Sequence, residues 1–386
     1  MFGIPIVQLR LLEKGVSIGT LLLVAVFLMG FYVYLELIDH EIVHPYKGLS
    51  NSGASTLAQN TPQKVSLSSC ERNMSAASIQ SFSSLPEHMQ DFLYYQHCRH
   101  FPLLLDLPNK CGGADQSSEV FLLLVIKSGP ENHERREMLR KTWAKERIQS
   151  GVWIRLIFLI GTTGSGFERK RLNKVVELEH SQYKDILQWD FTDTFCNLTL
   201  KQVIFLEWFE RNCPKARFLL DGDDDVFVNT NNVVKYLQSL KDNDGSKHLF
   251  AGCQVWTGPV RDSGNKYFVP VQLYESNEYP PYCSGGGFIM SGYTASVIYN
   301  MSKSIPLIPI DDAYMGMCLN KAGLSPSLHG GVKTFGVHFR SEHVDDYDPC
   351  FYKELLLVHR FLSEKIYFMW HSVNDPNLKC FGNDKK

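Results

Sequence analysis

The sequence predicts an α/β fold with a mostly parallel central sheet, and two observations lead to this prediction. From Val120 onward, apolar runs with the length of buried strands alternate with stretches of helical periodicity. Repeated units of this kind place helices on both faces of a parallel sheet. In addition, a cluster of carboxylates follows one apolar run, and open sheets of this type bind ligands beyond the carboxyl ends of their strands.

The alternating elements can be assigned in order along the chain. They are a strand over VFLLLVIK, a helix over HERREMLRKTWAKER, a strand over VWIRLIFLIG, a helix over 167–180, a strand over 186–189 and a helix over 198–211. The last helix carries an apolar face from Leu200 to Trp208, and Pro214 follows its end. The sequence shows no internal repeat, no P-loop and no G-x-G-x-x-G motif.

The stretch FLLDGDDDVFV, residues 218–228, combines a buried strand with four carboxylates in five positions. Gly222 lets the backbone turn, so that Asp223, Asp224 and Asp225 project into one small volume. Carboxylates this close repel one another, and hard divalent cations prefer oxygen ligands, so we predict a Mg²⁺ or Mn²⁺ site. The alternative is a solvated acidic turn. An EF-hand is excluded, because the positions that require Gly and Glu are occupied by Val and Asn.

The first 119 residues are expected to tether the domain to a membrane. Residues 15–35 are uncharged and long enough to span about 30 Å of hydrocarbon, so they predict a transmembrane signal anchor, with a cleaved signal peptide as the alternative. Arg10 and Lys14 keep residues 1–14 cytoplasmic, and residues 36–119 form a lumenal stem and transitional segment. The formal net charge of −2 implies no nucleic-acid partner.

Two further features suit a lumenal location for residues 120–386, the predicted catalytic domain. There are ten cysteines, which fit an oxidising compartment, and N-glycosylation triplets occur at Asn73, Asn197 and Asn300. Cys318, Cys350 and Cys380 lie in the motif-bearing region and are expected in disulfides, although the cysteine count does not determine their pairing.

Other residue groups have both a chemical and a structural interpretation. Arg136 and Arg140 share a helix face and suit a diphosphate, but a solvated basic face is the alternative. The YPPYCSGGGFIM stretch, residues 279–290, allows close approach of a ligand or forms a structural turn. At Asp311 and Asp312, one carboxylate is expected to cap a helix while its neighbour acts as a general base. His359 is by default a core histidine.

Taken together, RREMLRKTW, FLLDGDDDVFV, YPPYCSGGGF and IPIDDAYMGMCL resemble the β-1,3-glycosyltransferase family, from about Val120 to Cys380. The details are most similar to the β-1,3-N-acetylglucosaminyltransferases, since galactosyltransferase relatives more often have Glu where Asp311 stands. The resemblance implies a GT-A type, Rossmann-like domain whose DxD motif, here Asp223 and Asp225, holds the metal of a nucleotide sugar. It also implies that Asp224 belongs to the donor-binding motif.

The same resemblance implies roles for the other motif residues. Asp225 is the expected direct metal ligand, and His359 completes the metal site. Asp312 is the expected catalytic base. Four further residues are expected to bind the donor: Arg136, Arg140, Gly286 and Gly287.

The function implied is an inverting transfer of N-acetylglucosamine from UDP-GlcNAc, with Mn²⁺ or Mg²⁺, to a terminal β-galactose of a glycan. The compartment implied is the Golgi lumen. The resemblance is compatible with an oligomer as well as with a monomer. Three other functions are alternatives: transfer from UDP-galactose, an aspartyl-phosphate phosphatase, and a lumenal lectin without turnover. A second acid centre at Asp312, distinct from the metal cluster, argues against the lectin.

Overall fold

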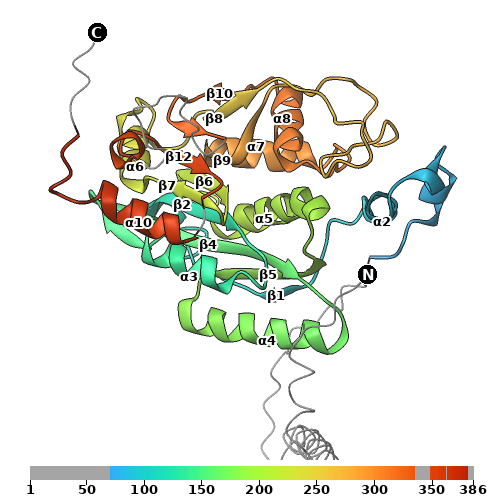
Figure 1. Ribbon diagram of the computed structural model, residues 1–386, viewed down its shortest axis with the longest axis horizontal. Helices are drawn as coiled ribbons and strands as arrows, with labels where there is room; N and C mark the ends of the chain where they lie inside the picture. Colours follow the sequence, from blue (N-terminus) through green and yellow to red (C-terminus); the bar gives the residue numbers. More distant parts are fainter. Residues whose placement is uncertain (1–69, 335–347, 362, 381–386) are drawn as a thin grey trace, which may run out of the picture. The chain divides into compact units, whose positions relative to one another are not determined.

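The computed structural model describes residues 70–334, 348–361 and 363–380 (Figure 1). The predicted cytoplasmic tail, the predicted anchor over residues 15–35 and most of the predicted stem lie outside these ranges. None of the helices within the described ranges has the length and apolar character that crossing a membrane requires.

A nine-stranded sheet forms the centre of the fold, with the path β1-β5-β4-β2-β6-β9-β8-β10 and β3 paired to β4. The strands are β1 (Leu103–Leu105), β2 (Val120–Lys127), β3 (Arg147–Gln149), β4 (Val152–Thr162), β5 (Ile186–Thr192), β6 (Phe218–Asp223), β8 (Phe250–Val255), β9 (Tyr282–Ser291) and β10 (Ser327–Leu328). A second sheet of three strands contains β7 (Val226–Val228), β11 (Val332–Lys333) and β12 (Leu357–His359).

The central strands β5, β4, β2 and β6 run parallel, as predicted from the βα alternation. The sheet as a whole is mixed, because β9 runs antiparallel to both β6 and β8 and β1 runs antiparallel to β5. The prediction of a mostly parallel sheet is therefore right for the centre and for the pair β8 and β10, and it fails for β9, β1 and β3, which run antiparallel to their neighbours. The chain returns from β8 to β9 through a loop rather than a crossover helix, which permits the antiparallel pairing.

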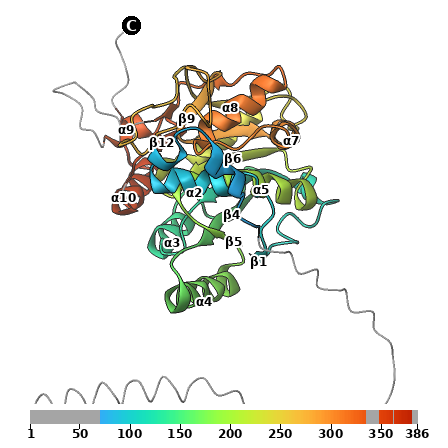
Figure 2. The same cartoon turned by 90° about the vertical axis from the view of Figure 1, so that its right-hand side faces the viewer.

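Helices cover both faces of the sheet. They are α2 (Glu87–Tyr95), α3 (His133–Lys141), α4 (Gly166–Tyr183), α5 (Leu198–Asn212), α6 (Thr230–Ser239), α7 (Gly292–Ser302), α8 (Asp311–Lys321), α9 (Pro349–Tyr352) and α10 (Ser363–Val373). Figure 2 shows α3 and α10 on one side of the central strands and α5 on the other.

The strand β2 is buried on both faces, which explains its uninterrupted apolar sequence. Its alternate residues enter two different cores: Leu123 and Val125 pack with residues of α5, α7 and α8, whereas Leu122 and Leu124 pack with residues of α3, α6 and α10. The carboxyl ends of β2 and β6 consequently lie next to each other between the two layers, and the site described below is built there.

The segment before Val120 is partly folded onto this domain. The strand β1 pairs with β5 in the central sheet, and a disulfide joins Cys111 to Cys213 at the end of α5. A second disulfide joins Cys70 to Cys98, around α2. The folded unit therefore begins before the predicted boundary at residue 120, because short elements stapled by cysteines carry too little apolar periodicity to be recognised in the sequence.

The third disulfide joins Cys350 to Cys380, two of the three cysteines for which bridges were predicted. The prediction was wrong for Cys318, whose thiol is free and fully buried within α8. Its position on the inward face of a helix makes it a small apolar core residue rather than a bridge partner.

Candidate functional site

Asp223, Asp225 and His359 form a candidate metal centre at the carboxyl end of β6. Their ligand atoms all lie within 4.8 Å of one another. His359 arrives from far along the chain because β12 pairs antiparallel to β7, with His359 opposite Val226. Its Nε2 lies 3.3 Å from Asp225 Oδ1. Two carboxylates and an imidazole are a suitable donor set for Mn²⁺, so the residues present fit the predicted ion.

Burial alone would raise the pKa of Asp225, but the adjacent His359 outweighs this effect and lowers the pKa below its usual range. At Asp223 the effect of burial prevails, since the nearby Lys127 lowers the pKa but the neighbouring carboxylates of Asp311 and Asp225 act with burial, and the pKa is raised. The cluster therefore holds one carboxylate, Asp225, that ionises readily, and a second, Asp223, whose ionised form a nearby cation would stabilise.

The glycines of the GGG stretch explain how His359 fits against β9. Gly286 has a φ of 75°, and a Cβ at this position would lie 2.5 Å from His359 Cδ2. A Cβ at Gly287 would lie 2.6 Å from Leu357 Cδ1, on the same strand as His359. The structure thus places both glycines against β12, where they allow the imidazole to approach the sheet.

Lys127 is the functional candidate that sequence reasoning missed. It is the last residue of β2, it is almost fully buried, and its Nζ lies 2.7 Å from Asp311 Oδ2 and 3.4 Å from Asp223 Oδ1. A third carboxylate, Asp221, lies 3.7 Å away. Burial opposes the charge of the ammonium, but the surrounding aspartates prevail and raise the pKa of Lys127 well above its usual value. The signal in the sequence was a lysine that ends an otherwise apolar strand.

Asp311 and Asp312 occupy the first turn of α8, where carboxylates favour the positive end of the helix. The N-cap residue is Ile310, so the expected side-chain cap is absent at this helix end. Asp311 is instead the ion-pair partner of Lys127. Burial and the charge of Asp311 raise the pKa of Asp312 well above its usual value, while a backbone hydrogen bond from Gly285 acts in the opposite direction. The raised pKa of Asp312 is compatible with the role of base that was predicted for it.

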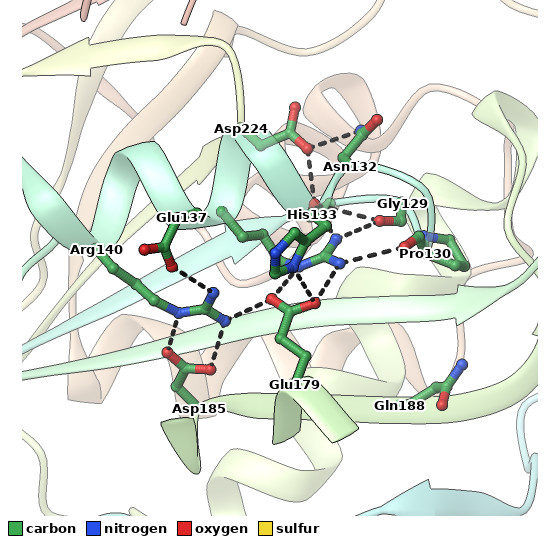
Figure 3. Close-up of polar contacts among 12 residues, drawn as sticks. Gly129, Pro130, Asn132, His133, Glu137, Arg140, Glu179, Asp185, Gln188 and Asp224 are labelled. Carbon is green, nitrogen blue, oxygen red and sulfur yellow. Dashed lines mark hydrogen bonds and ion pairs between the residues drawn. The ribbon is translucent and has the colours of Figure 1, made fainter. Parts of the chain in front are cut away.

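Arg136 and Arg140 are held by carboxylates of the domain itself. Figure 3 shows Glu179 and Asp185 beside Arg140. The guanidinium of Arg136 is fully buried and donates to both oxygens of Glu179, at 2.8 and 2.7 Å. Arg140 donates to Glu179 at 2.7 Å and to Asp185 at 2.7 and 2.9 Å. This geometry does not fit the expectation that the two arginines bind a donor diphosphate. The sequence could not reveal their partners, which follow about 40 residues later.

Asp224 points away from the candidate metal centre. Its Oδ2 accepts hydrogen bonds from Ser128 at 2.7 Å and Asn132 at 2.8 Å, and its Oδ1 pairs with Arg135 at 2.8 Å. Since both oxygens already have donors within the domain, the structure gives Asp224 a role in holding the loop between β2 and α3. This differs from the donor-binding role expected of it.

We predict that Glu179→Gln lowers the free energy of unfolding by about 3 kcal/mol, because it leaves two buried guanidinium groups short of a counter-charge. Burial tends to raise the pKa of Glu179, but Arg136 and Arg140 hold it at about 2, below the usual 4.5. The ion-pair contribution is therefore complete above about pH 4.5 and is lost as the pH falls towards 2. Urea unfolding at pH 7 and at pH 3.5 measures both effects.

The matched control for Glu179→Gln is Lys141→Ala, which removes an exposed partner of Glu137 and should change the free energy of unfolding far less than Glu179→Gln at either pH. Equal small losses for the two variants would show that the buried network does not stabilise the domain.

We predict that Gly286→Ala weakens Mn²⁺ binding at least about tenfold, because the added Cβ must displace the His359 imidazole. Gly113→Ala is the control: Gly113 has a φ of 82° but no atom within 4 Å of the added Cβ. Both variants carry similar backbone strain, so only the displacement of His359 distinguishes them. Calorimetric titration of each purified variant with Mn²⁺ measures the difference. Equal Mn²⁺ affinities for the two variants would show that His359 is not a metal ligand.

Comparison with known proteins identifies the family. The Galactosyltransferase family model matches residues 134–328. The human protein named N-acetyllactosaminide beta-1,3-N-acetylglucosaminyltransferase 3 is 48% identical over 321 residues, which cover 83% of this chain and 84% of that protein. The human acetylgalactosaminyl-O-glycosyl-glycoprotein beta-1,3-N-acetylglucosaminyltransferase is 51% identical over 315 residues, covering 81% and 80%. The mouse UDP-GlcNAc:betaGal beta-1,3-N-acetylglucosaminyltransferase 7 is 40% identical over 321 residues, covering 82% and 78%. The chain therefore belongs to the galactosyltransferase family and is a glycosyltransferase.

Proposed function

We propose that this glycosyltransferase moves N-acetylglucosamine from UDP-GlcNAc to the 3-hydroxyl of a terminal β-galactose, with inversion at the anomeric carbon. The observation that carries the proposal is the presence of two distinct acid centres at one edge of the sheet. Asp223, Asp225 and His359 form the first, and Asp311 with Asp312 forms the second, with Lys127 between them. Relatives named for transfer of N-acetylglucosamine support this donor over UDP-galactose.

In the proposed mechanism, Asp223, Asp225 and His359 would hold Mn²⁺ or Mg²⁺, which neutralises the charge that develops on the departing diphosphate. Asp312 accepts the proton of the acceptor hydroxyl as this oxygen attacks the sugar from the face opposite the diphosphate. A single attack of this kind inverts the anomeric centre without a covalent intermediate. Gly286 and Gly287 would support this site indirectly, because the space that a Cβ would fill at each glycine is occupied by His359 and Leu357 of β12.

We also propose that the domain is of the GT-A type and works in the Golgi lumen, anchored by residues 15–35. The mixed α/β architecture around a central sheet supports the first point. Three disulfides support an oxidising compartment for the second. The charge asymmetry around the apolar segment supports the orientation.

A second acceptor class is favoured by one specific observation. The 51% identical relative is named for an acetylgalactosaminyl-O-glycosyl-glycoprotein acceptor, so an α-N-acetylgalactosamine linked to Ser or Thr is the alternative to galactose. Both acceptors present a 3-hydroxyl to the same base. The catalytic proposal is therefore the same for either one.

We predict that the full-length protein releases UDP from UDP-GlcNAc in the presence of Mn²⁺ and a β-galactoside, and that excess chelator abolishes this release. The measurement compares UDP-GlcNAc, UDP-galactose and UDP-N-acetylgalactosamine against β-galactosides and O-linked N-acetylgalactosamine peptides. A preference for UDP-galactose would contradict the donor assignment, and full activity in chelator would contradict the metal assignment.

We predict that Asp312→Asn lowers kcat at least about a hundredfold, the usual effect of removing a positioned base. The affinity for UDP with Mn²⁺ should be nearly unchanged, because the metal ligands remain. Asp311→Asn is the matched control and should cost only about tenfold, since the amide oxygen can still accept from Lys127. Steady-state kinetics with calorimetry tests both variants. If Asp311→Asn lowers kcat more than Asp312→Asn, then Asp311 is the base and Asp312 is the structural residue. If both variants keep full activity, neither aspartate is the base.

A further inference from the structure

Lys127 is the only cation whose ion pairs connect the two acid centres among the described residues. Its Cα is the register partner of Asp223 in the parallel pairing of β2 with β6. Its side chain extends from there to α8, where Nζ meets Asp311 at 2.7 Å. One buried ammonium thus contacts a carboxylate of the candidate metal centre and a carboxylate adjacent to the candidate base.

The surroundings of this ammonium leave it little freedom. Its side chain is 5% exposed, and three carboxylates from two different elements lie within 3.7 Å. Within the described part of the chain, Asp221 Oδ1 has no hydrogen-bond donor, so the nearby ammonium is its main electrostatic compensation. Without Lys127, these carboxylates would face one another across a buried space, where their repulsion is weakly screened.

The contact between Lys127 and Asp311 also leaves Asp312 as the carboxylate that is available to act as a base. Asp311 and Asp312 are consecutive in the first turn of α8, so their side chains point in different directions. Because Lys127 fixes Asp311, the start of the helix is fixed as well, and Asp312 is held in one orientation. The distance from Asp312 to the metal centre is then set through Lys127 and Asp223.

We propose that Lys127 is a positioning residue that holds the general base in register with the metal centre by binding Asp311 and Asp223 at the same time. This inference rests on the proposed function, since it presumes that Asp312 acts as the base. It assigns Lys127 no contact with either substrate. Lys127 acts on the chemical step through Asp311, because misplacing a reacting group by about 1 Å can cost about a hundredfold in rate.

The experiment measures Lys127→Met, Asp311→Asn and the double variant in the full-length protein. We expect Lys127→Met to lower kcat about a hundredfold while the KM for the donor and the affinity for Mn²⁺ with UDP change less than about fivefold. The double variant should be no slower than Lys127→Met alone, because Asp311→Asn acts only by weakening the ion pair that Lys127→Met has already removed. Lys127→Arg should recover part of kcat, since it keeps a cation there.

Three results would overturn the inference. The first is a kcat within about threefold of wild type for Lys127→Met. The second is a double variant whose losses multiply to about a thousandfold, which would mean that Lys127 and Asp311 act independently. The third is a loss confined to donor KM or Mn²⁺ affinity, which would make Lys127 part of the donor site. If Lys127→Met does not fold, Lys127→Arg with and without Asp311→Asn gives the same comparison.

The outcome is separable from the proposed function. If wild type uses a donor or acceptor other than UDP-GlcNAc and galactose, the same variants are compared on the substrates that it does use. Calorimetric binding of Mn²⁺ with UDP does not depend on turnover, so it reports on the metal centre even when the acceptor is not identified.

Discussion

Electrostatic repulsion among buried carboxylates is the constraint on which this site depends. Asp221 and Asp223 end β6, and Asp311 and Asp312 begin α8, so the fold brings acidic groups together from two directions. Such an arrangement is stable only with compensating positive charge. The protein provides one such charge permanently, as Lys127, and the donor set of Asp223, Asp225 and His359 is suited to a second, as a divalent ion. Catalytic geometry and stability therefore depend on the same charges.

A second network of charged residues, centred on Arg136 and Arg140, lies outside the carboxylate cluster around Lys127 but helps to hold it in place. Arg136 and Arg140 tie α3 to Glu179 on α4 and to Asp185 before β5. Arg136 also donates to backbone oxygens of the loop that follows β2. Asp224 holds the same loop from the opposite side. The loop directly after Lys127 is thus fixed from two directions, so the lysine sits on a rigid support rather than at a free strand end.

The sequence predicted those parts of the structure that depend on short-range pattern. The apolar runs of β2, β4 and β6 and the DxD motif were recognisable because each lies within a few residues. The partners of Arg136 and Arg140 were not, because Glu179 and Asp185 meet them only after α4 has folded back. The same reason applies to Lys127, whose partners are about 100 and 184 residues away. Only the family resemblance pointed to His359 as a metal ligand, because the residues around it in the sequence predict a core histidine.

The position of His359 shows how the fold limits the metal site. Of the three candidate ligands, Asp223 ends β6 and Asp225 lies in the turn before β7. His359 depends instead on β12 pairing with β7 and on Gly286 leaving space for the ring. The segment that carries β12 also begins close to Cys350, which is bridged to Cys380. An ion that binds only when all three ligands are assembled favours the state in which this C-terminal segment is docked. For such an ion, metal binding and docking of β12 would be linked equilibria, and each would strengthen the other by the same free energy.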